Sequence, residues 1–289
     1  MRRYLSLKRA RIARLKSYID VATRINLPRA KGRRYPVEIA AAAWFDLLGY
    51  GSMLAKAGFD PTQSGATEAV GRLRDFQRTI ATHGHRNFPV MLINDGAVLF
   101  RDLSPRGKSV SFDFLARAID AFKAVNRLER DAGHPGARMV VAVGARMRVT
   151  GVVRASATHR DDILRRLDTG ELSARQAIFE AFRAEPVAGF VPRLQANFAF
   201  TKAYLADQDG KEAGLGGPKC YIDLALFDIP AATWVSFSRT QEWSGLGMSA
   251  LFGELDEFDR VEAGRKQFAG IRDAHGVAEH LGIAKYGAL

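Results

Sequence analysis

Between Pro36 and Gly144 the chain alternates short apolar runs with stretches whose apolar residues recur every three or four positions. The runs 37–48, 88–93, 97–100 and 139–143 have the length of strands, whereas 64–82 and 115–128 have the spacing of helices buried on one face. Asn94-Asp95-Gly96, between two apolar runs, predicts a tight β-hairpin. The order strand, helix, hairpin, helix, strand predicts a βαββαβ alternation and an α+β fold, with helices on one face of a sheet.

The pattern after Gly144 predicts further elements but no repeat. Helices are expected at 160–168, at 173–184, where Ser173 and Gln176 form a capping box, and at 193–206. Strands are expected at 219–227 and 233–238, and the tail from Ser249 onward is predicted to be mostly helical. We therefore expect a basic N-terminal arm and linker at 1–36, a main domain at 37–228, and a C-terminal extension at 229–289 packed on that domain.

The net charge of +12 is concentrated at the N-terminus. Residues 1–36 carry twelve Lys and Arg against the single acid Asp20, so +11 of the charge belongs to the arm and +1 to the rest. Apolar residues from Leu5 to Ala22 recur there at helical spacing, and Pro28 and Pro36 favour a linker after the helix. Such a basic helix suits docking on nucleic acid, acidic lipid or an acidic partner, and equally suits packing on its own domain.

Two further observations exclude classes of protein. The single cysteine, Cys220, rules out an internal disulfide framework and a cysteine-based zinc site. No apolar run approaches the roughly 20 residues that span a bilayer, and the N-terminus lacks the apolar segment of a signal peptide. We therefore expect a cytoplasmic protein.

Asp46 and Asp95 are the acidic residues most suggestive of chemistry. Asp46 ends an otherwise apolar strand, and Asp95 occupies the tip of the predicted hairpin. If the hairpin lies antiparallel beside the first strand, the two carboxylates meet, and a divalent cation relieves their repulsion. A simpler interpretation also stays open, because Asp95 suits the turn on its own account and Asp46 suits a helix cap.

The two segments that contain Asp46 and Asp95 resemble motifs of a known family. Residues 44–50, Trp-Phe-Asp-Leu-Leu-Gly-Tyr, resemble the Phe-x-Asp-Ile-x-Gly-Phe signature of the class III nucleotidyl cyclase domain, which has a ferredoxin-like fold. Residues 93–98, Ile-Asn-Asp-Gly-Ala-Val, resemble that family's second metal-binding hairpin. The resemblance covers about residues 37–228 and is closest to the Pycsar-type pyrimidine cyclases of bacterial anti-phage defence.

The resemblance implies a function and a site. Asp46 and Asp95 would be catalytic and hold two Mn²⁺ or Mg²⁺ ions with the carbonyl of Leu47, while Leu48, Gly49 and Tyr50 would line the triphosphate. The substrate would be a pyrimidine nucleoside triphosphate, UTP favoured over CTP, and the product a 3′,5′-cyclic nucleotide that activates a separate effector protein. The sites of this family form between two chains, so a head-to-tail homodimer with shared active sites is implied.

The sequence departs from the purine cyclases at two positions. Met91 stands where they carry a base-reading lysine, and in the Asn-x-x-x-Arg motif Asn197 is kept but Thr201 replaces the arginine, with Lys202 one step beyond. Asn197 is therefore a candidate catalytic residue, and Arg101 and Lys202 are candidates for contacts with the base or phosphates. The alternative function is a catalytically inactive cyclase-fold protein that binds nucleic acid or membrane through its basic arm.

Overall fold

The computed structural model describes residues 36–148, 157–183 and 191–283, so the basic helix predicted in the N-terminal arm lies outside the described residues. The chain divides into two compact units. One is built from 36–148 with the residues from 193 onward, and the other includes the helical segment between 149 and 192.

The larger unit is a seven-stranded mixed sheet with strand order β2-β3-β1-β4-β5-β7-β6. Strands β1 to β4 pair antiparallel, with β1 between β3 and β4, which is the arrangement that the predicted βαββαβ alternation requires. β5 then pairs parallel with β4, and β7 antiparallel with β5. The α+β fold is confirmed. The strands are β1 (Val37–Leu47), β2 (Val90–Ile93), β3 (Gly96–Asp102), β4 (Ala137–Met147), β5 (Cys220–Asp223), β6 (Val235–Gly245) and β7 (Met248–Phe258).

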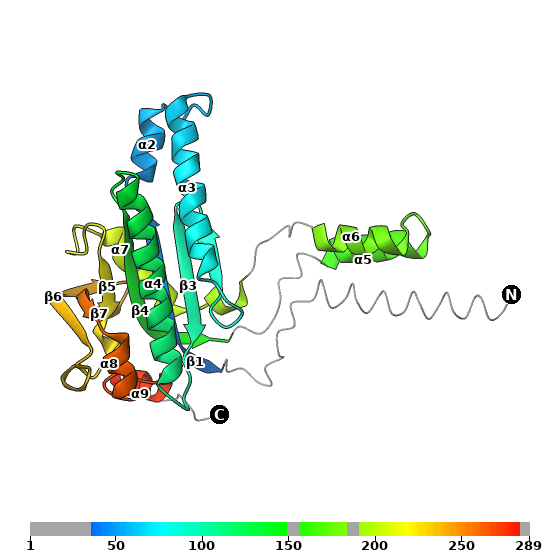
Figure 1. Cartoon of the computed structure of the whole chain (residues 1–289). Helices are drawn as coiled ribbons and strands as arrows, with labels where there is room; N and C mark the ends of the chain where they lie inside the picture. The colour runs from blue at the N-terminus through cyan, green and yellow to red at the C-terminus, as the bar shows by residue number, and fades with distance from the viewer. Residues whose placement is uncertain (1–35, 149–156, 184–190, 284–289) are drawn as a thin grey trace. The chain divides into compact units, whose positions relative to one another are not determined.

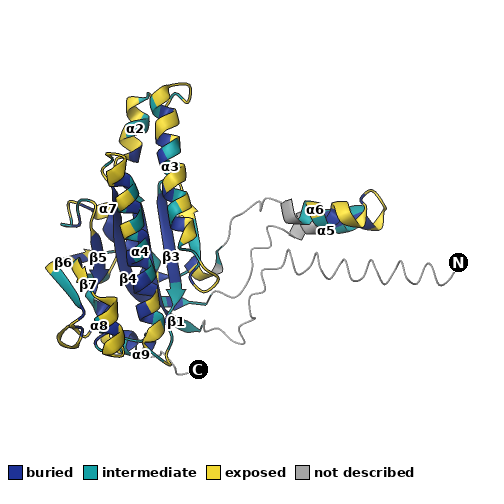
Figure 2. Ribbon diagram, viewed as in Figure 1, coloured by how far each residue is buried: buried dark blue, intermediate teal, exposed yellow. Residues whose placement is uncertain are grey.

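The two helices of the predicted alternation, α3 (Ser64–Thr82) and α4 (Ser109–Asp131), cover one face of this sheet, as expected, and α7 covers the opposite face. Alternate residues of β1, such as Phe45, are buried in one core with α3 and α4, which lie side by side over the sheet (Figures 1 and 2). Trp44 points the other way, where its ring contacts Phe200 and Tyr204 of α7. The helices of this unit are α2 (Tyr50–Lys56), α3 (Ser64–Thr82), α4 (Ser109–Asp131), α7 (Phe198–Asp209), α8 (Arg260–Arg265) and α9 (Ala274–His280), with short 3₁₀ turns η1 (Pro192–Leu194), η2 (Leu224–Leu226) and η3 (Ile229–Ala231).

The small residues of α7 and β4 explain how this helix lies so close to the sheet. Ala199, Ala203 and Ala206 are fully buried. Opposite them, a Cβ on Gly144 would come within 2.9 Å of the Ala199 main-chain nitrogen, so only glycine allows this approach. The helix expected at 193–206 is α7, which runs from Phe198 to Asp209.

The mostly helical tail predicted from Ser249 is wrong for its first ten residues, because residues 248–258 form β7, and the helices α8 and α9 follow that strand. Strands β6 and β7 are joined by Leu246 and Gly247, which both have positive φ, at 49° and 75°. Such a turn suits a two-residue hairpin, but Leu-Gly lacks the Asn-Gly signal that reveals one in a sequence. Pairing with β5 and β6 outweighs the helix propensity of the Met, Ala, Leu and Glu residues in this segment.

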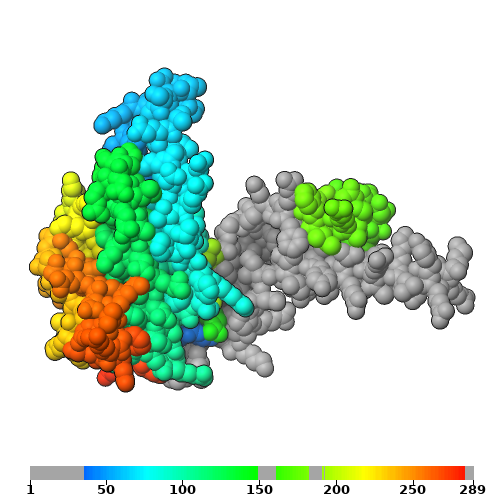
Figure 3. Space-filling view, viewed as in Figure 1, coloured from blue at the N-terminus to red at the C-terminus, as the bar shows by residue number. Residues whose placement is uncertain are grey.

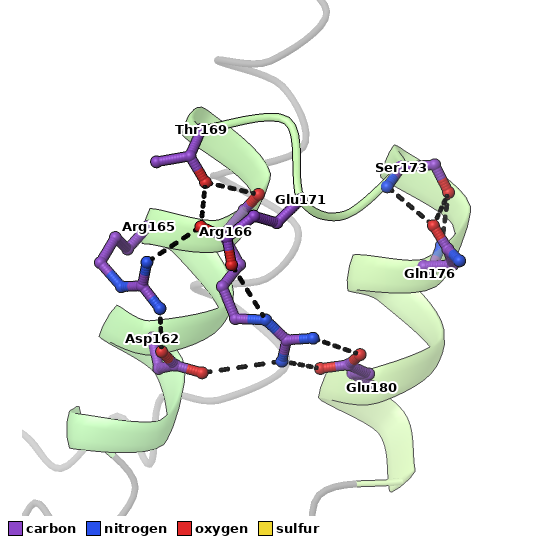
Figure 4. A network of polar contacts seen from close by, with 8 residues as sticks. All are labelled: Asp162, Arg165, Arg166, Thr169, Glu171, Ser173, Gln176 and Glu180. Atoms are coloured by element: carbon purple, nitrogen blue, oxygen red, sulfur yellow. Dashed lines mark hydrogen bonds and ion pairs between the residues drawn. The ribbon is translucent and has the colours of Figure 1, made fainter.

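The smaller unit contains a helical pair, α5 (Ala157–Asp168) and α6 (Ala174–Arg183), at the predicted positions. Figure 4 shows the polar contacts that join the two helices, with Arg166 between Asp162 of its own helix and Glu180 of α6. The predicted capping box is present: the main-chain N–H of Gln176 donates to the Ser173 hydroxyl, and the Gln176 side-chain oxygen accepts from the Ser173 N–H. Among all described helices, none is both long and apolar enough to cross a membrane.

Candidate active site

The tip of the β2–β3 hairpin lies beside the end of β1. Asp46 is directly opposite Gly96 in the β1–β3 ladder, and the Leu47 N–H donates a 3.0 Å hydrogen bond to the main-chain oxygen of Asp95. The Asp46 side chain is 26% exposed, and Asp95 is half-buried. Two acidic residues 49 positions apart in the sequence are therefore brought to the same end of the sheet.

Close packing fixes the hairpin tip. A Cβ on Gly96 would collide with the Trp44 ring, so the absence of a side chain at Gly96 lets the indole lie against the hairpin. Asn94 has a φ of 51°, its amide donates to Asp95 Oδ1, and its main-chain oxygen accepts from Gln77 of α3. The turn residues that predicted the hairpin thus also hold the Asp95 carboxylate.

Two charged residues that the sequence analysis missed complete this end of the sheet. Arg138 of β4 lies opposite Asp46 in the ladder, and its Nη2 is 3.5 Å from Asp46 Oδ2. The same guanidinium donates to Asp207 Oδ1 at 2.5 Å and to the Asp207 main-chain oxygen at 2.8 Å. Trp44 Nε1 donates to the other carboxylate oxygen of Asp207, so the buried Asp207 holds both side chains. The sequence contained one signal for Arg138, because it is the only charged residue in the apolar run 137–145.

The charges of the cluster act strongly on Asp46. Burial, together with the carboxylates of Asp207 and Asp95, raises the pKa of Asp46 to about 6, although Arg138 acts in the opposite direction. The carboxylates of Asp46, Asp95 and Asp207 outnumber the single guanidinium of Arg138, so these four groups carry a net negative charge when all are ionised. The arrangement favours any ligand that brings positive charge to Asp46.

The donor set suits a divalent cation that is shared with a phosphate. Carboxylate oxygens are the ligands that Mg²⁺ and Mn²⁺ prefer, and such ions are commonly held by one or two carboxylates with substrate phosphates. Among the described residues, no group of three or more His, Cys, Asp or Glu side chains gathers to hold an ion. The two carboxylates of Asp46 and Asp95 fit a cation whose other ligands are substrate oxygens.

The segment after Asp46 forms a turn at the same end of the sheet. The Leu48 N–H donates to the main-chain oxygen of Gly136 at 3.0 Å, and Gly49, with a φ of 78°, is the N-cap of α2. Tyr50 is buried, and burial together with the Asp95 carboxylate raises the pKa of its phenol. The predicted triphosphate-lining residues Leu48, Gly49 and Tyr50 are thus contiguous with Asp46 and Asp95.

Asn197 caps α7. Its side-chain oxygen accepts from the Phe200 N–H at 3.0 Å, and its amide nitrogen donates to the Arg193 main-chain oxygen at 2.8 Å. Thr201, at the position of the family's arginine, donates its hydroxyl to the Asn197 main-chain oxygen. Asn197 as a residue is 2% exposed, and both hydrogen bonds of its amide lie within its own turn.

Lys202 and Arg101 lie away from the two carboxylates of their own chain. The Lys202 ammonium is buried and donates to Val143 O and Asp223 Oδ2, both at 2.9 Å. Val143 is five residues along β4 from Arg138, about 17 Å at the usual rise of a strand. Arg101 is likewise five residues along β3 from Gly96, and its guanidinium lies 4.6 Å from the centre of the Phe88 ring.

Comparison with known proteins finds similarity in structure only. No protein-family model matches the sequence, and no curated protein matches it. The chain is similar to the guanylyl cyclase Cya2, with 12% identity and a TM-score of 0.44 over 79% of this chain and 96% of that one. It is similar to the adenylyl cyclase CyaB from P. aeruginosa, with 10% identity and a TM-score of 0.44 over 79% and 98% of the two chains. For the guanylate cyclase domain of RhGC from Catenaria anguillulae, in complex with GTP, the values are 9% and 0.44 over 79% and 100%. These similarities are too weak to carry an argument, and the function proposed below rests on the site's own residues.

Proposed function

We propose that this chain is a divalent-cation-dependent pyrimidine nucleotide cyclase, which converts UTP, in preference to CTP, to the 3′,5′-cyclic nucleotide and pyrophosphate. The observation that carries the proposal is the placement of Asp46 opposite Gly96, with the Leu47–Asp95 main-chain hydrogen bond beside it. The role of the product, a second messenger that activates a separate effector in anti-phage defence, follows from the resemblance of residues 44–50 and 93–98.

In this proposal Asp46 and Asp95 hold Mn²⁺ or Mg²⁺, with the Leu47 carbonyl as a further ligand, and the turn from Leu48 to Tyr50 lines the triphosphate. Bound cations lower the pKa of the ribose 3′-hydroxyl and neutralise phosphate charge. The 3′ oxygen forms a bond to the α-phosphorus, the bond from that phosphorus to the bridging oxygen breaks, and pyrophosphate leaves. The hydroxyl proton passes to solvent. The chain's contribution is to fix the reacting groups and their charges in advance.

The preference for a pyrimidine follows from the resemblance, and the residues beside the carboxylates are compatible with it. Met91, at the position of the purine-reading lysine, pairs with Val98, which in turn pairs with Trp44. Because directly opposed residues share a face of a sheet, these three apolar side chains form one uncharged row. A row without a cation gives no reason to prefer a purine.

A head-to-tail homodimer with shared sites is part of the proposal. Within one chain, Asn197 caps a helix, and neither Lys202 nor Arg101 reaches the carboxylates. A site whose remaining polar groups come from a second copy is compatible with this separation.

The test is turnover by the purified chain with Mn²⁺ and each of the four nucleoside triphosphates, followed by separation of the products. We expect cyclic UMP as the main product, and losses of at least about 100-fold in Asp46→Asn and Asp95→Asn. The matched control is Asp75→Asn, an exposed aspartate of α3 whose carboxylate forms no hydrogen bond or ion pair within the described residues. Absence of any cyclic product, or product undiminished in the two variants, contradicts the proposal.

The concentration of charge in residues 1–36 supports the second candidate, a non-catalytic protein that binds through its arm. It predicts salt-sensitive binding to nucleic acid or anionic vesicles that is lost on removal of residues 1–36, because phosphate contacts release counterions. It also predicts that no nucleotide is turned over, which separates it from the cyclase.

A further inference from the structure

A buried ion pair links the two helices that cover the sheet. Arg72 of α3 and Glu129 of α4 each have only 2% of the side chain exposed, with Nη2 2.5 Å from Oε2 and Nε 3.0 Å from the same oxygen. Phe76 and Val125, on the same two helices, are fully buried apolar residues. Apolar residues of similar volume usually stabilise such a position at least as well as a buried ion pair. Stability alone therefore does not account for the pair.

The guanidinium of Arg72 has a third partner outside the two helices. Its Nη2 also donates to the main-chain oxygen of Leu48 at 2.8 Å, and its Nη1 is 3.4 Å from Met53 Sδ. The pair thus reaches the turn between β1 and α2 from the inside of the molecule. Figure 3 shows the surfaces of α3 and α4 side by side, and both side chains of the pair between these helices are buried.

This contact sets the direction of one peptide group. A trans peptide is planar, so the C=O of Leu48 and the N–H of Gly49 point in opposite directions. With the oxygen held from the buried side by Arg72, the Gly49 N–H faces away from the ion pair. No described residue accepts a hydrogen bond from it, and Gly49 is exposed.

The other hydrogen bonds that hold the turn are made between main-chain groups. The Leu47 N–H donates to Asp95 O, and the Leu48 N–H donates to Gly136 O. Arg72 supplies the one side-chain hydrogen bond to the Leu48 carbonyl among the described residues, and Glu129 fixes the position of Arg72. Substitution can therefore remove this contact and leave the others in place.

We propose that the buried Arg72–Glu129 pair is a positioning device for the nucleotide: it holds the Leu48–Gly49 peptide so that its N–H faces the triphosphate. The inference rests on the proposed cyclase activity. A hydrogen bond made equally in the bound substrate and in the transition state affects KM rather than kcat. Loss of folded protein has the opposite signature, because it lowers apparent kcat and leaves KM unchanged.

The experiment compares steady-state kinetics with UTP for the full chain and for Arg72→Met/Glu129→Met, an apolar replacement of the pair. We expect KM to rise about tenfold while kcat stays within threefold and the melting temperature does not fall. Arg72→Lys keeps the charge but lacks the planar fork that serves carboxylate and carbonyl together, so we expect a smaller rise in KM, of about threefold. The control is Arg166→Met/Glu180→Met, an Arg–Glu pair of the α5–α6 helices, which should leave KM unchanged.

A folded double variant with wild-type KM, or a loss confined to apparent kcat, overturns the positioning role. If the double variant does not fold, the KM of Arg72→Lys decides, and an unchanged KM overturns the proposal. Failure of both variants to fold also overturns it, because the pair would then serve stability. An inactive wild-type chain has a different meaning. It refutes the cyclase proposal itself, before any variants are compared.

Discussion

The main-chain N–H of Leu47 donates to the main-chain oxygen of Asp95, and this 3.0 Å hydrogen bond joins the end of β1 to the tip of the β2–β3 hairpin. Because it involves no side chain, neighbouring carboxylates can be altered without breaking it. It holds Asp46 and Asp95 together on rigid elements, against their electrostatic repulsion, which is among the causes of the raised pKa of Asp46. Carboxylates held together in this way are poised for a cation at a cost in stability.

The first prediction concerns the cost in folding stability of holding Asp46 beside the other carboxylates. Because its pKa in the folded chain is about 6, against 3.8 ordinarily, Asp46 favours folding most below pH 3.8, and this contribution is lost as the pH rises through 6. Asp46→Asn removes the charge, so we expect the metal-free protein to gain up to about 3 kcal/mol in free energy of unfolding at pH 7.5 and little at pH 4. Urea denaturation at the two pH values measures this. An Asn variant less stable than wild type at pH 7.5 would contradict it.

The second prediction concerns cation binding against pH. A protonated Asp46 cannot hold Mn²⁺, so we expect the affinity of the free protein for Mn²⁺ to fall as the pH is lowered through about 6. Asp207→Asn removes a carboxylate that raises this pKa, so the midpoint should move to lower pH. Calorimetric Mn²⁺ titrations between pH 5 and 8 provide the measurement, with Asp75→Asn as the control that keeps the wild-type midpoint. A midpoint that moves upward in Asp207→Asn is incompatible with the electrostatics described here.

The third prediction concerns the contribution of the buried ion pair Arg138–Asp207 to the free energy of unfolding. Arg138→Met leaves Asp207 buried without its cation, which typically costs about 3–5 kcal/mol in free energy of unfolding. Arg138→Met/Asp207→Leu removes both charges, and we expect it to recover most of that loss. Denaturant midpoints of the two variants and of Asp207→Leu complete a double-mutant cycle. Simple additivity of the two single substitutions would show that the 2.5 Å contact carries no coupling.

The elements that the sequence predicted well are those whose apolar period and turn residues agree. The helix expected at 64–82 is α3, with those bounds, and the Asn94-Asp95-Gly96 tip is the β2–β3 turn. Asp46 and Asp95 could be placed together because the hairpin fixes the register, and register determines which residues are opposed.

The elements that sequence reasoning missed depend on contacts between distant segments. Strand β7 is held by its neighbours despite helix-favouring residues, and α7 lies on the second face because Gly144 admits it. Asp207 has no local signal, since its partners Arg138 and Trp44 are 69 and 163 residues away. Arg72 and Glu129 look like ordinary charges of two amphipathic helices, and only the packing of α3 on α4 shows that they are buried.

The final prediction concerns Asn197, which the motif resemblance makes catalytic and whose amide caps α7. Asn197→Ala removes the acceptor of the Phe200 N–H, so we expect a loss of about 1 kcal/mol in free energy of unfolding. Serine is an equally good cap, so Asn197→Ser should restore most of that stability. Because both ends of the amide are engaged within its own turn, we expect the serine variant to retain cyclase activity within about threefold. Denaturation and turnover measured on the same preparations test both statements. A stable Asn197→Ser protein with a hundredfold loss of kcat would instead assign the amide to the substrate, as the motif predicted.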